Sequence, residues 1–189
     1  MTNYCSVGFC FDKNKKNDII QTLLSYFCAE EIEAQACFDC EKGDWREVRS
    51  EKIDISEFEM LDINFCTKKY GEALTVRVEK QNADNEYAVL LSFEEEPLLK
   101  VTGGLKNCYE RFSEAVKHVI KNEPLICAFC DNNADFDRGT EEILQAPFKR
   151  YSIVWHGVKE NQIEVFLSPW EIDGFTKRQK ESEVFTIGD

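Results

Sequence analysis

The stretch LKNCYERFSEAVKHVIK, residues 105–121, decides the fold class, because it is the strongest single element that the sequence predicts. Its apolar residues recur every three or four positions, as on the buried face of an α-helix: Leu105, Cys108, Tyr109, Phe112, Ala115, Val116, Val119 and Ile120. Pro124 ends this pattern, and the apolar residues 125–130 are predicted to form a strand. The helix therefore belongs to a fold that also contains a sheet.

Upstream of this helix, apolar residues alternate with polar ones, which is typical of half-buried strands. The alternation has four parts: Ile53 and Ile55; Leu61, Ile63 and Phe65; Leu74, Val76 and Val78; and Tyr87, Val89, Leu91 and Phe93. Turn-forming residues at 82–85 predict a hairpin between the last two strands. Pro97 and the pair Gly103-Gly104 are expected to break regular structure before the helix.

Further out, the sequence predicts a strand over residues 4–11, a helix that ends near Glu31 and a strand over 34–40. Downstream we expect an acidic loop at 131–140, a short helical turn at 141–145 and a hairpin of 151–155 with 163–167. The charged segment from about residue 169 is expected to be loose, except where Val184, Phe185 and Ile187 dock.

These elements predict one α+β domain over residues 1–189, a mostly antiparallel twisted sheet with two main helices packed on one face. A strand–helix–strand unit that ends in Cys37 and Cys40 is echoed by one that ends in Cys127 and Cys130. Two interpretations stay open here. The echo marks two similar β–α–β halves, or it is a coincidence in a chain with nine cysteines.

The composition favours some partners and disfavours others. The chain has 36 Asp and Glu residues against 23 Lys and Arg residues, a formal net charge of −13, which repels nucleic acid and anionic membranes. Its first residues carry no signal peptide, and no apolar run is long enough to span a membrane. The cysteines are odd in number and lie among apolar residues, as buried reduced thiols do. We therefore expect a cytoplasmic protein that contacts neither nucleic acid nor membrane.

Two patterns suggest metal sites, but each fails on one physical point. The two Cys-x-x-Cys pairs fall on strands, where residues i and i+3 point to opposite faces, so a pair can reach one zinc ion only if the backbone bends. Neither pair has the Gly or Pro that usually makes such a bend, so we expect buried packing cysteines. Residues 131–142 place oxygen donors at the ligand positions of a calcium loop: Asp131, Asn133, Asp135, Asp137 and Glu142. Phe136 occupies the position that requires glycine, so we expect an acidic loop with Phe136 in the core, and no metal or cofactor.

Catalytic motifs are absent from the sequence: there is no P-loop, no dinucleotide-binding fingerprint, no Gly-x-Ser-x-Gly and no His-Glu-x-x-His. His118 and His156 are the only histidines, and both are expected to be structural. One alternative is a hydrolase or transferase with a Cys/His or carboxylate/His cleft. A second alternative is a structural metal-binding module. The favoured prediction is a non-enzymatic protein.

Separate acidic clusters then remain as the candidate binding surface for a basic protein, because carboxylates around apolar side chains speed association and anchor a partner. The candidate partner-binding residues are Glu57, Glu59, Asp62, Glu94, Glu95, Glu96, Asp131, Asp135 and Asp137. A solvated acidic surface without a partner is the competing interpretation of each cluster. The sequence leaves the oligomeric state open.

The whole-chain profile resembles that of the small acidic α+β immunity proteins that bacteria carry beside polymorphic or contact-dependent toxins. The resemblance rests on the single acidic domain, the missing catalytic motifs and strand–helix–strand units such as residues 105–131. It implies a protein that binds a cognate toxin tightly and neutralises it. Toxins that attack nucleic acid are often basic, so the resemblance also implies a basic partner.

Overall fold

The computed structural model describes residues 4–12, 19–27, 33–39, 42–46, 60–67, 71–80, 86–122, 125–136, 139–149, 151–159, 162–168 and 183–188. Four helices occur in this part of the chain: α1 (Ile19–Phe27), α2 (Glu95–Thr102), α3 (Leu105–Asn122) and α4 (Thr140–Gln145). The strands are β1 (Tyr4–Asp12), β2 (Glu33–Asp39), β3 (Asp44–Arg46), β4 (Met60–Thr67), β5 (Gly71–Lys80), β6 (Glu86–Glu94), β7 (Leu125–Asn132), β8 (Ile153–Lys159), β9 (Gln162–Leu167) and β10 (Glu183–Gly188).

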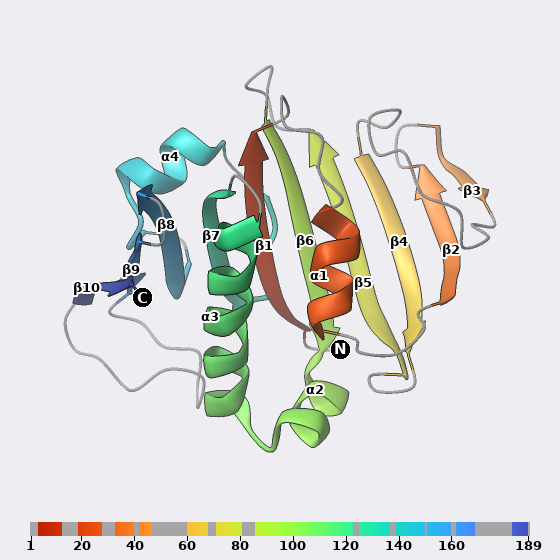
Figure 1. Ribbon diagram of the computed structural model, residues 1–189. Coiled ribbons are helices and arrows are strands. Elements are labelled where there is room, and N and C mark those ends of the chain that lie inside the picture. The colour runs from red at the N-terminus through yellow and green to blue at the C-terminus, as the bar shows by residue number, and fades with distance from the viewer. Residues whose placement is uncertain are drawn as a thin grey trace.

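Within the described residues, the ten strands form one sheet in the order β10-β9-β8-β7-β1-β6-β5-β4-β2-β3, seen across Figure 1. Every pair of neighbouring strands is antiparallel. The predicted mostly antiparallel sheet and the α+β class are therefore confirmed. Because β1 lies between β7 and β6, the first strand of the chain joins the two sequence halves of the sheet.

The two strand–helix–strand units are both present, but they are not similar halves. From β1 through α1 the chain crosses three strands before it reaches β2, whereas from β6 through α3 it crosses only β1 to reach β7. The interpretation as two equivalent β–α–β halves is therefore wrong. The shared strand–helix–strand order arises because any crossover between parallel strands needs a connecting element.

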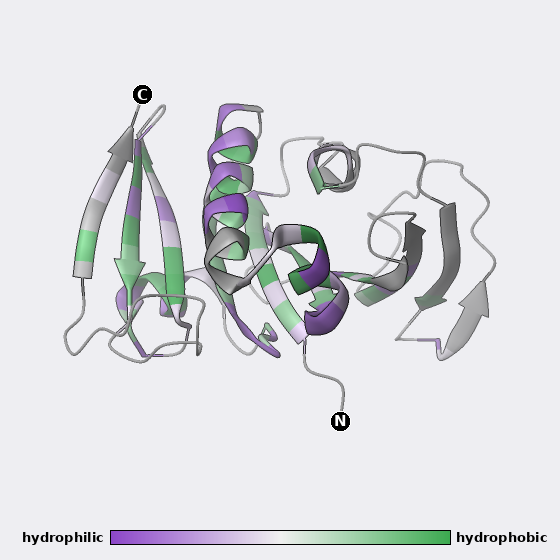
Figure 2. Cartoon of the chain, turned by 90° about the horizontal axis from the view of Figure 1, so that it is seen from below, coloured by the Kyte–Doolittle hydropathy of each residue, from purple (hydrophilic) through white to green (hydrophobic). Residues whose placement is uncertain are grey.

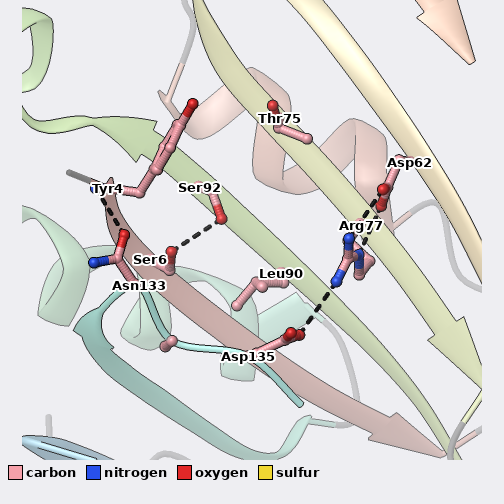
Figure 3. A pocket seen from close by; sticks show the side chains of 10 residues that line it. Tyr4, Ser6, Asp62, Thr75, Arg77, Leu90, Ser92, Asn133 and Asp135 are labelled. Atoms are coloured by element: carbon pink, nitrogen blue, oxygen red, sulfur yellow. Dashed lines mark hydrogen bonds and ion pairs between the residues drawn. The ribbon is translucent and has the colours of Figure 1, made fainter. Parts of the chain in front are cut away.

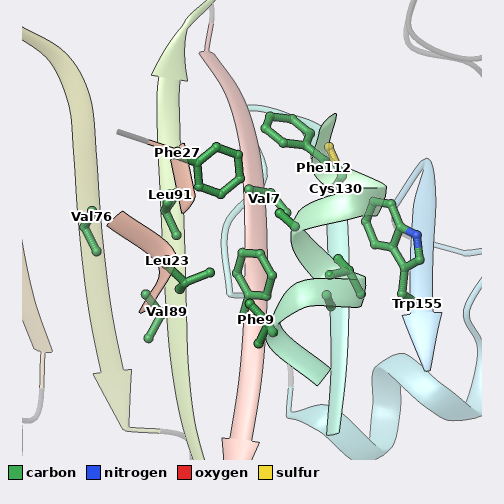
Figure 4. Packing of buried hydrophobic residues seen from close by; sticks show 14 of the residues in the cluster. Val7, Phe9, Leu23, Phe27, Val76, Val89, Leu91, Phe112, Cys130 and Trp155 are labelled. Carbon is green, nitrogen blue, oxygen red and sulfur yellow. The ribbon is translucent and has the colours of Figure 1, made fainter. Parts of the chain in front are cut away.

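The main core lies between the sheet and the helices α1, α2 and α3, and α1 and α3 lie on the near side of the sheet in Figure 1. Alternate strand residues such as Phe9 and Leu91 pack there against Leu23, Phe27 and Phe112 (Figure 4). Polar and apolar residues alternate along α3 in Figure 2, as in an amphipathic helix. The predicted helix at 105–121 is confirmed, and the described part of its apolar stripe faces the core: Cys108, Phe112, Ala115, Val116 and Val119 are buried and Ile120 is partly buried.

A second core lies on the opposite face of the sheet, under α4. Its strand residues include Cys10, Leu90 and Phe129, which alternate along their strands with residues of the main core, and the cluster also contains Phe136 and Ile143. The predicted burial of Phe136 is confirmed, since 9% of the residue is exposed. The prediction of helices on one face alone missed this layer, because α4 has only six residues and a weak periodic signal.

Helix α2 was also missed, since Pro97 and Gly103 predicted a break. Proline is tolerated in the first turn of a helix, where its missing N–H has no partner anyway, and α2 begins at Glu95. Gly103, with φ 76°, ends the helix in the left-handed conformation and donates its N–H to the Leu99 carbonyl at 2.8 Å. The pair Gly103-Gly104 therefore marks the end of α2 as well as the break before α3.

The C-terminal strand β10 pairs with β9 at the edge of the sheet. The expected docking of Val184 is wrong at the level of its side chain, which remains 48% exposed although its backbone is paired. The predicted strand around Ile53 and the segment 169–182 lie outside the described residues.

Candidate functional site

Among the described residues, the second face of the sheet carries an apolar cluster over β7, β1 and β8, whereas the residues of β4 and β5 on this face belong to no such cluster. Along these two strands, the residues that point to the helices are buried, among them Ile63 and Val76. Their alternate neighbours are partly exposed and polar: Asp62, Asn64, Thr75, Arg77 and Glu79. We call these five residues, with the partly exposed Ser92 of β6 and the buried Ser6 of β1 beside it, the open face. Antiparallel sheets often keep one polar face in contact with solvent. We take the open face as the candidate functional surface because a hollow and an arginine–carboxylate cluster lie on it.

A hollow of about 250 Å³ lies where the open face meets the segment 133–135 (Figure 3). Its lining is mixed, with hydroxyl, charged and apolar side chains: Tyr4, Ser6, Asp62, Thr75, Arg77, Leu90, Ser92, Asn133, Ala134 and Asp135. Ser6 and Ser92 face each other across β1 and β6, with their Oγ atoms 2.9 Å apart. Small side chains at this position leave the space that the hollow occupies.

Arg77 is the charged centre of the hollow. Its Nε and Nη2 atoms donate to the two carboxylate oxygens of Asp62 at 2.7 and 3.0 Å, a bidentate pair. Its Nη1 atom donates to Oδ1 of Asp135 at 3.3 Å, a longer contact to a side chain that is 54% exposed. The guanidinium group therefore fixes Asp62 firmly and Asp135 loosely.

Glu79 lies two residues along β5 from Arg77, on the same face of the sheet. Partial burial raises the pKa of the Glu79 carboxyl above its ordinary value, and the negative charges of Asp135 and Asp62 raise it further. Arg77 acts in the opposite direction but does not cancel these effects. One arginine thus serves three carboxylates, and the site keeps an excess of negative charge.

The wall of the hollow, residues 133–136, is held by backbone and side-chain hydrogen bonds. Asn133 accepts a hydrogen bond from the Tyr4 N–H at its Oδ1 atom (3.1 Å) and donates its own N–H to the Tyr4 carbonyl (2.9 Å). The Tyr151 hydroxyl donates to the Asp135 carbonyl at 2.8 Å, and Phe136 is buried beneath. The second core therefore positions the Asp135 carboxylate.

The structure brings together only some of the predicted partner-binding residues. Asp62 and Asp135, 73 positions apart in the sequence, meet at Arg77. Glu94 lies on the same face, because it is opposite Tyr4 in the β1–β6 register and alternates with Ser92. Glu95 and Glu96 instead lie in the first turn of α2, where Glu96 pairs with Lys100 at 2.6 Å. These last two do not belong to the open face.

Other predicted residues are used differently or lie outside the described part. Asp131 accepts hydrogen bonds from the N–H groups of Asn132 (2.7 Å) and Ser152 (3.1 Å), so it is a structural residue, and burial raises the pKa of its carboxyl. Glu57, Glu59 and Asp137 lie outside the described residues.

Sequence reasoning missed Arg77, Glu79, Thr75 and the two serines. The sequence does contain a signal for them, because they occupy the polar positions that alternate with the apolar positions of the predicted strands. Only the apolar positions entered the prediction.

Three of the five candidate calcium ligands make separate contacts, and Asp137 lies outside the described residues. Asp131 binds backbone N–H groups, Asn133 binds β1 and Asp135 binds Arg77. Among the described residues, no group of three or more His, Cys, Asp or Glu side chains could hold a metal ion. On β7, Cys127 packs in the second core and Cys130 in the main core, so the expected separation of this Cys-x-x-Cys pair onto opposite faces is confirmed.

The two histidines lie away from the hollow. His118 is exposed on α3, and its ring lies 5.4 Å from that of Tyr26. His156 is opposite Cys127 in the β7–β8 register, but the adjacent Cys10 thiol and burial hold the pKa of Cys127 well above its ordinary value. A thiol that does not ionise is a poor nucleophile, so this pair lacks the activation that a Cys/His cleft requires.

Among the described residues, no helix is both long and apolar enough to cross a membrane. A comparison with curated proteins finds no match. Residues 50–178, more than half of the chain, match the model of a protein family described as Immunity protein 64. All residues that line the hollow, except Tyr4 and Ser6, lie within the matched residues.

Proposed function

Since the chain belongs to the Immunity protein 64 family, we propose that it binds a cognate toxin protein and neutralises it without catalysing a reaction. The observation that supports this proposal beyond the family is the open face, a polar part of the sheet over which none of the described helices packs and which carries the hollow. A second protein that covers this half would complete the layer that α4 begins on the other half.

We further propose that the toxin presents a basic surface to this face. Asp62, Glu79, Glu94 and Asp135 lie on one side of the sheet, with Arg77 as the compensating charge in the hollow. The net charge of −13 adds a long-range attraction for a basic protein, which raises the association rate. Among the described residues, the proposed partner-binding set is therefore Asp62, Glu94 and Asp135, with Glu79 added, while Glu57, Glu59 and Asp137 stay predictions.

The proposal extends to the organisation and location of the protein. One continuous sheet from β10 to β3 supports a single domain over residues 1–189. The cysteines Cys5, Cys10, Cys108, Cys127 and Cys130 are free and buried, which supports a reducing compartment such as the cytoplasm. A membrane or nucleic-acid partner is not part of the proposal, because the acidic charge disfavours both.

The experiment uses the product of the open reading frame beside the gene of this protein. Cells that express this product alone should stop growing, and co-expression of the full chain should restore growth. The two proteins should co-purify, and their affinity should fall between 50 and 500 mM salt, since exposed charge pairs are screened. Rescue by a mechanism without a complex, or an affinity that does not depend on salt, contradicts the proposal.

A further inference from the structure

We infer that the hollow on the open face receives one long basic side chain of the toxin, an arginine or a lysine. This inference rests on the proposed function and specifies the group of the partner that the site recognises. Three features of the hollow support it: its shape, its charge and the contacts that Arg77 already makes.

The shape of the hollow suits a single extended side chain. Ser6, Ser92 and Thr75 lie side by side on three adjacent strands, because Ser92 is opposite Ser6 in one register and opposite Thr75 in the next. Their short side chains form a floor, and Ala134 adds a short side chain to the wall. Tyr4 and Leu90 offer apolar surface for the methylene stem of an arginine or lysine.

The charges select a cationic end group. Two N–H donors of Arg77 already hold Asp62, so a carboxylate of the partner would have to compete with a bidentate ion pair. Oδ1 of Asp135 accepts the Phe136 N–H at 2.9 Å and Nη1 of Arg77 at 3.3 Å, but the Asp135 side chain is 54% exposed, so the carboxylate can accept further hydrogen bonds from an incoming donor. Glu79 lies beside it in a negative environment that a cation would relieve.

The uncovered floor also distinguishes this hollow from the rest of the sheet face. Over β1 and β7 the equivalent space is filled by the protein itself, where the Phe129 ring stacks on Tyr151 at 4.0 Å. On the open face a hollow lies beside Ser6 and Ser92, although Ser6 itself is only 1% exposed. The bound side chain of the toxin would occupy the position that Phe129 and Tyr151 take on the covered half.

The direct test is a titration of the isotope-labelled full chain with Nα-acetyl-L-argininamide, followed by amide chemical shifts. The matched neutral probe is the corresponding citrulline derivative, which has the same length and shape without the charge. We expect a saturable shift of the Ser6, Ser92 and Asp135 amides with the arginine probe, with a dissociation constant on the order of millimolar. Shifts of the same size with citrulline, or shifts confined to other surfaces, would overturn the inference.

Two pairs of variants locate the effect. Ser92→Phe fills the hollow and should abolish the shifts, while Ser25→Phe, at an exposed position of α1, should leave them unchanged. Asp135→Asn removes the exposed charge and should weaken binding of the probe about tenfold, while Glu110→Gln, exposed on α3, should not. If Ser92→Phe does not fold, Asp135→Asn still tests the inference through the affinity for the arginine probe.

The same variants separate this inference from the proposed function. If the wild-type chain binds the toxin and Ser92→Phe binds it with unchanged affinity, the hollow receives no toxin side chain and the inference is wrong, although the function stands. If the wild-type chain does not bind the toxin, the proposed function itself fails. The expected result is toxin binding by the wild type and at least about tenfold weaker binding by Ser92→Phe.

Discussion

Gly8, in the central strand β1, is the residue on which the covered half of the sheet depends. A Cβ atom at this position would lie 2.2 Å from Cζ of Phe129 and 2.5 Å from Cε1 of the same ring. The ring cannot retreat freely, because it stacks on Tyr151 and meets Phe136 edge-on at 5.2 Å. The absence of a side chain at Gly8 therefore lets this aromatic cluster lie close against the sheet.

We predict that Gly8→Ala lowers the free energy of unfolding by about 1–3 kcal/mol, the usual cost of overpacking a core. Chemical denaturation monitored by circular dichroism measures this value. Gly139→Ala is the matched control, since a Cβ atom at this position would meet nothing within 4 Å and the φ of −65° suits alanine. The control should change stability by less than about 1 kcal/mol. Equal effects of the two changes would refute the role of Gly8.

Glu79 gives the protein a pH dependence with a defined sign. Its pKa is raised in the folded protein by burial and by Asp135 and Asp62, so the folded state holds this proton to a higher pH than the unfolded state does. The contribution of Glu79 is therefore fully present below the pKa of the unfolded chain, near pH 4, and is lost as pH rises through the folded pKa.

The variant Glu79→Gln cannot ionise, and we predict that it gains stability relative to the wild type as pH rises from about 4 to about 7. Denaturation of both proteins at several pH values measures this difference. Glu110→Gln, exposed on α3, should show no such trend. A difference that shrinks towards neutral pH would show that the pKa of Glu79 is not raised in the folded protein.

The buried cysteines should not react in the folded protein. Cys5, Cys10, Cys108, Cys127 and Cys130 are at most 1% exposed, and burial and neighbouring thiols hold the pKa of Cys130 well above its ordinary value. We predict that iodoacetamide leaves these five unmodified under native conditions and modifies all of them in denaturant. Peptide mass spectrometry reads both states. Fast native alkylation of Cys127 would contradict the account of an unreactive thiol.

At the scale of the element, the segment 133–136 links the second core to the hollow. The Tyr151 hydroxyl, on a residue that is 3% exposed, holds the Asp135 carbonyl. We predict that Tyr151→Phe costs about 0.5–1.5 kcal/mol of stability, the value of one lost hydrogen bond, and also weakens toxin binding. Denaturation and calorimetric titration measure the two effects. Loss of stability with unchanged binding would mean that Asp135 does not act at the interface.

The elements differ in how far the sequence predicted them. Helix α3 and strands β4 to β7 were predicted because their periodic patterns extend over many residues. Helix α2 was not, because the Pro97 and Gly103 signals of a break are also the signals of a helix start and end. Helix α4 was expected as a short turn, but its position on the far face follows from tertiary packing of Ile143, which local pattern does not encode.

At the scale of the whole molecule, the candidate site depends on strand order. The sequence pointed to Asp62 and Asp135 as members of separate acidic clusters, but their meeting at Arg77 requires that β1 lie between β6 and β7. Nothing in the local pattern predicts this order, because β1 and β6 are separated by most of the first half of the chain. The acidic surface was predictable, whereas its organisation around one arginine was not.

The same strand order explains why one surface is available to a partner. Apolar side chains of α1, α2 and α3 cover one face of the sheet, and apolar side chains of α4 cover part of the other face. The remaining polar part of the sheet, with the hollow at its border, is the surface that the protein's own helices leave open. An immunity protein needs such a surface to be rigid before binding, and a sheet supplies that rigidity.

The most direct test of toxin binding at the open face is the affinity of the toxin encoded beside this gene for Asp135→Lys, compared with Glu110→Lys as a control of equal charge change. Calorimetric titration at low salt should show binding at least about tenfold weaker for Asp135→Lys and close to the wild-type value for Glu110→Lys. Equal affinities of the two variants would contradict the claim that the open face binds the toxin.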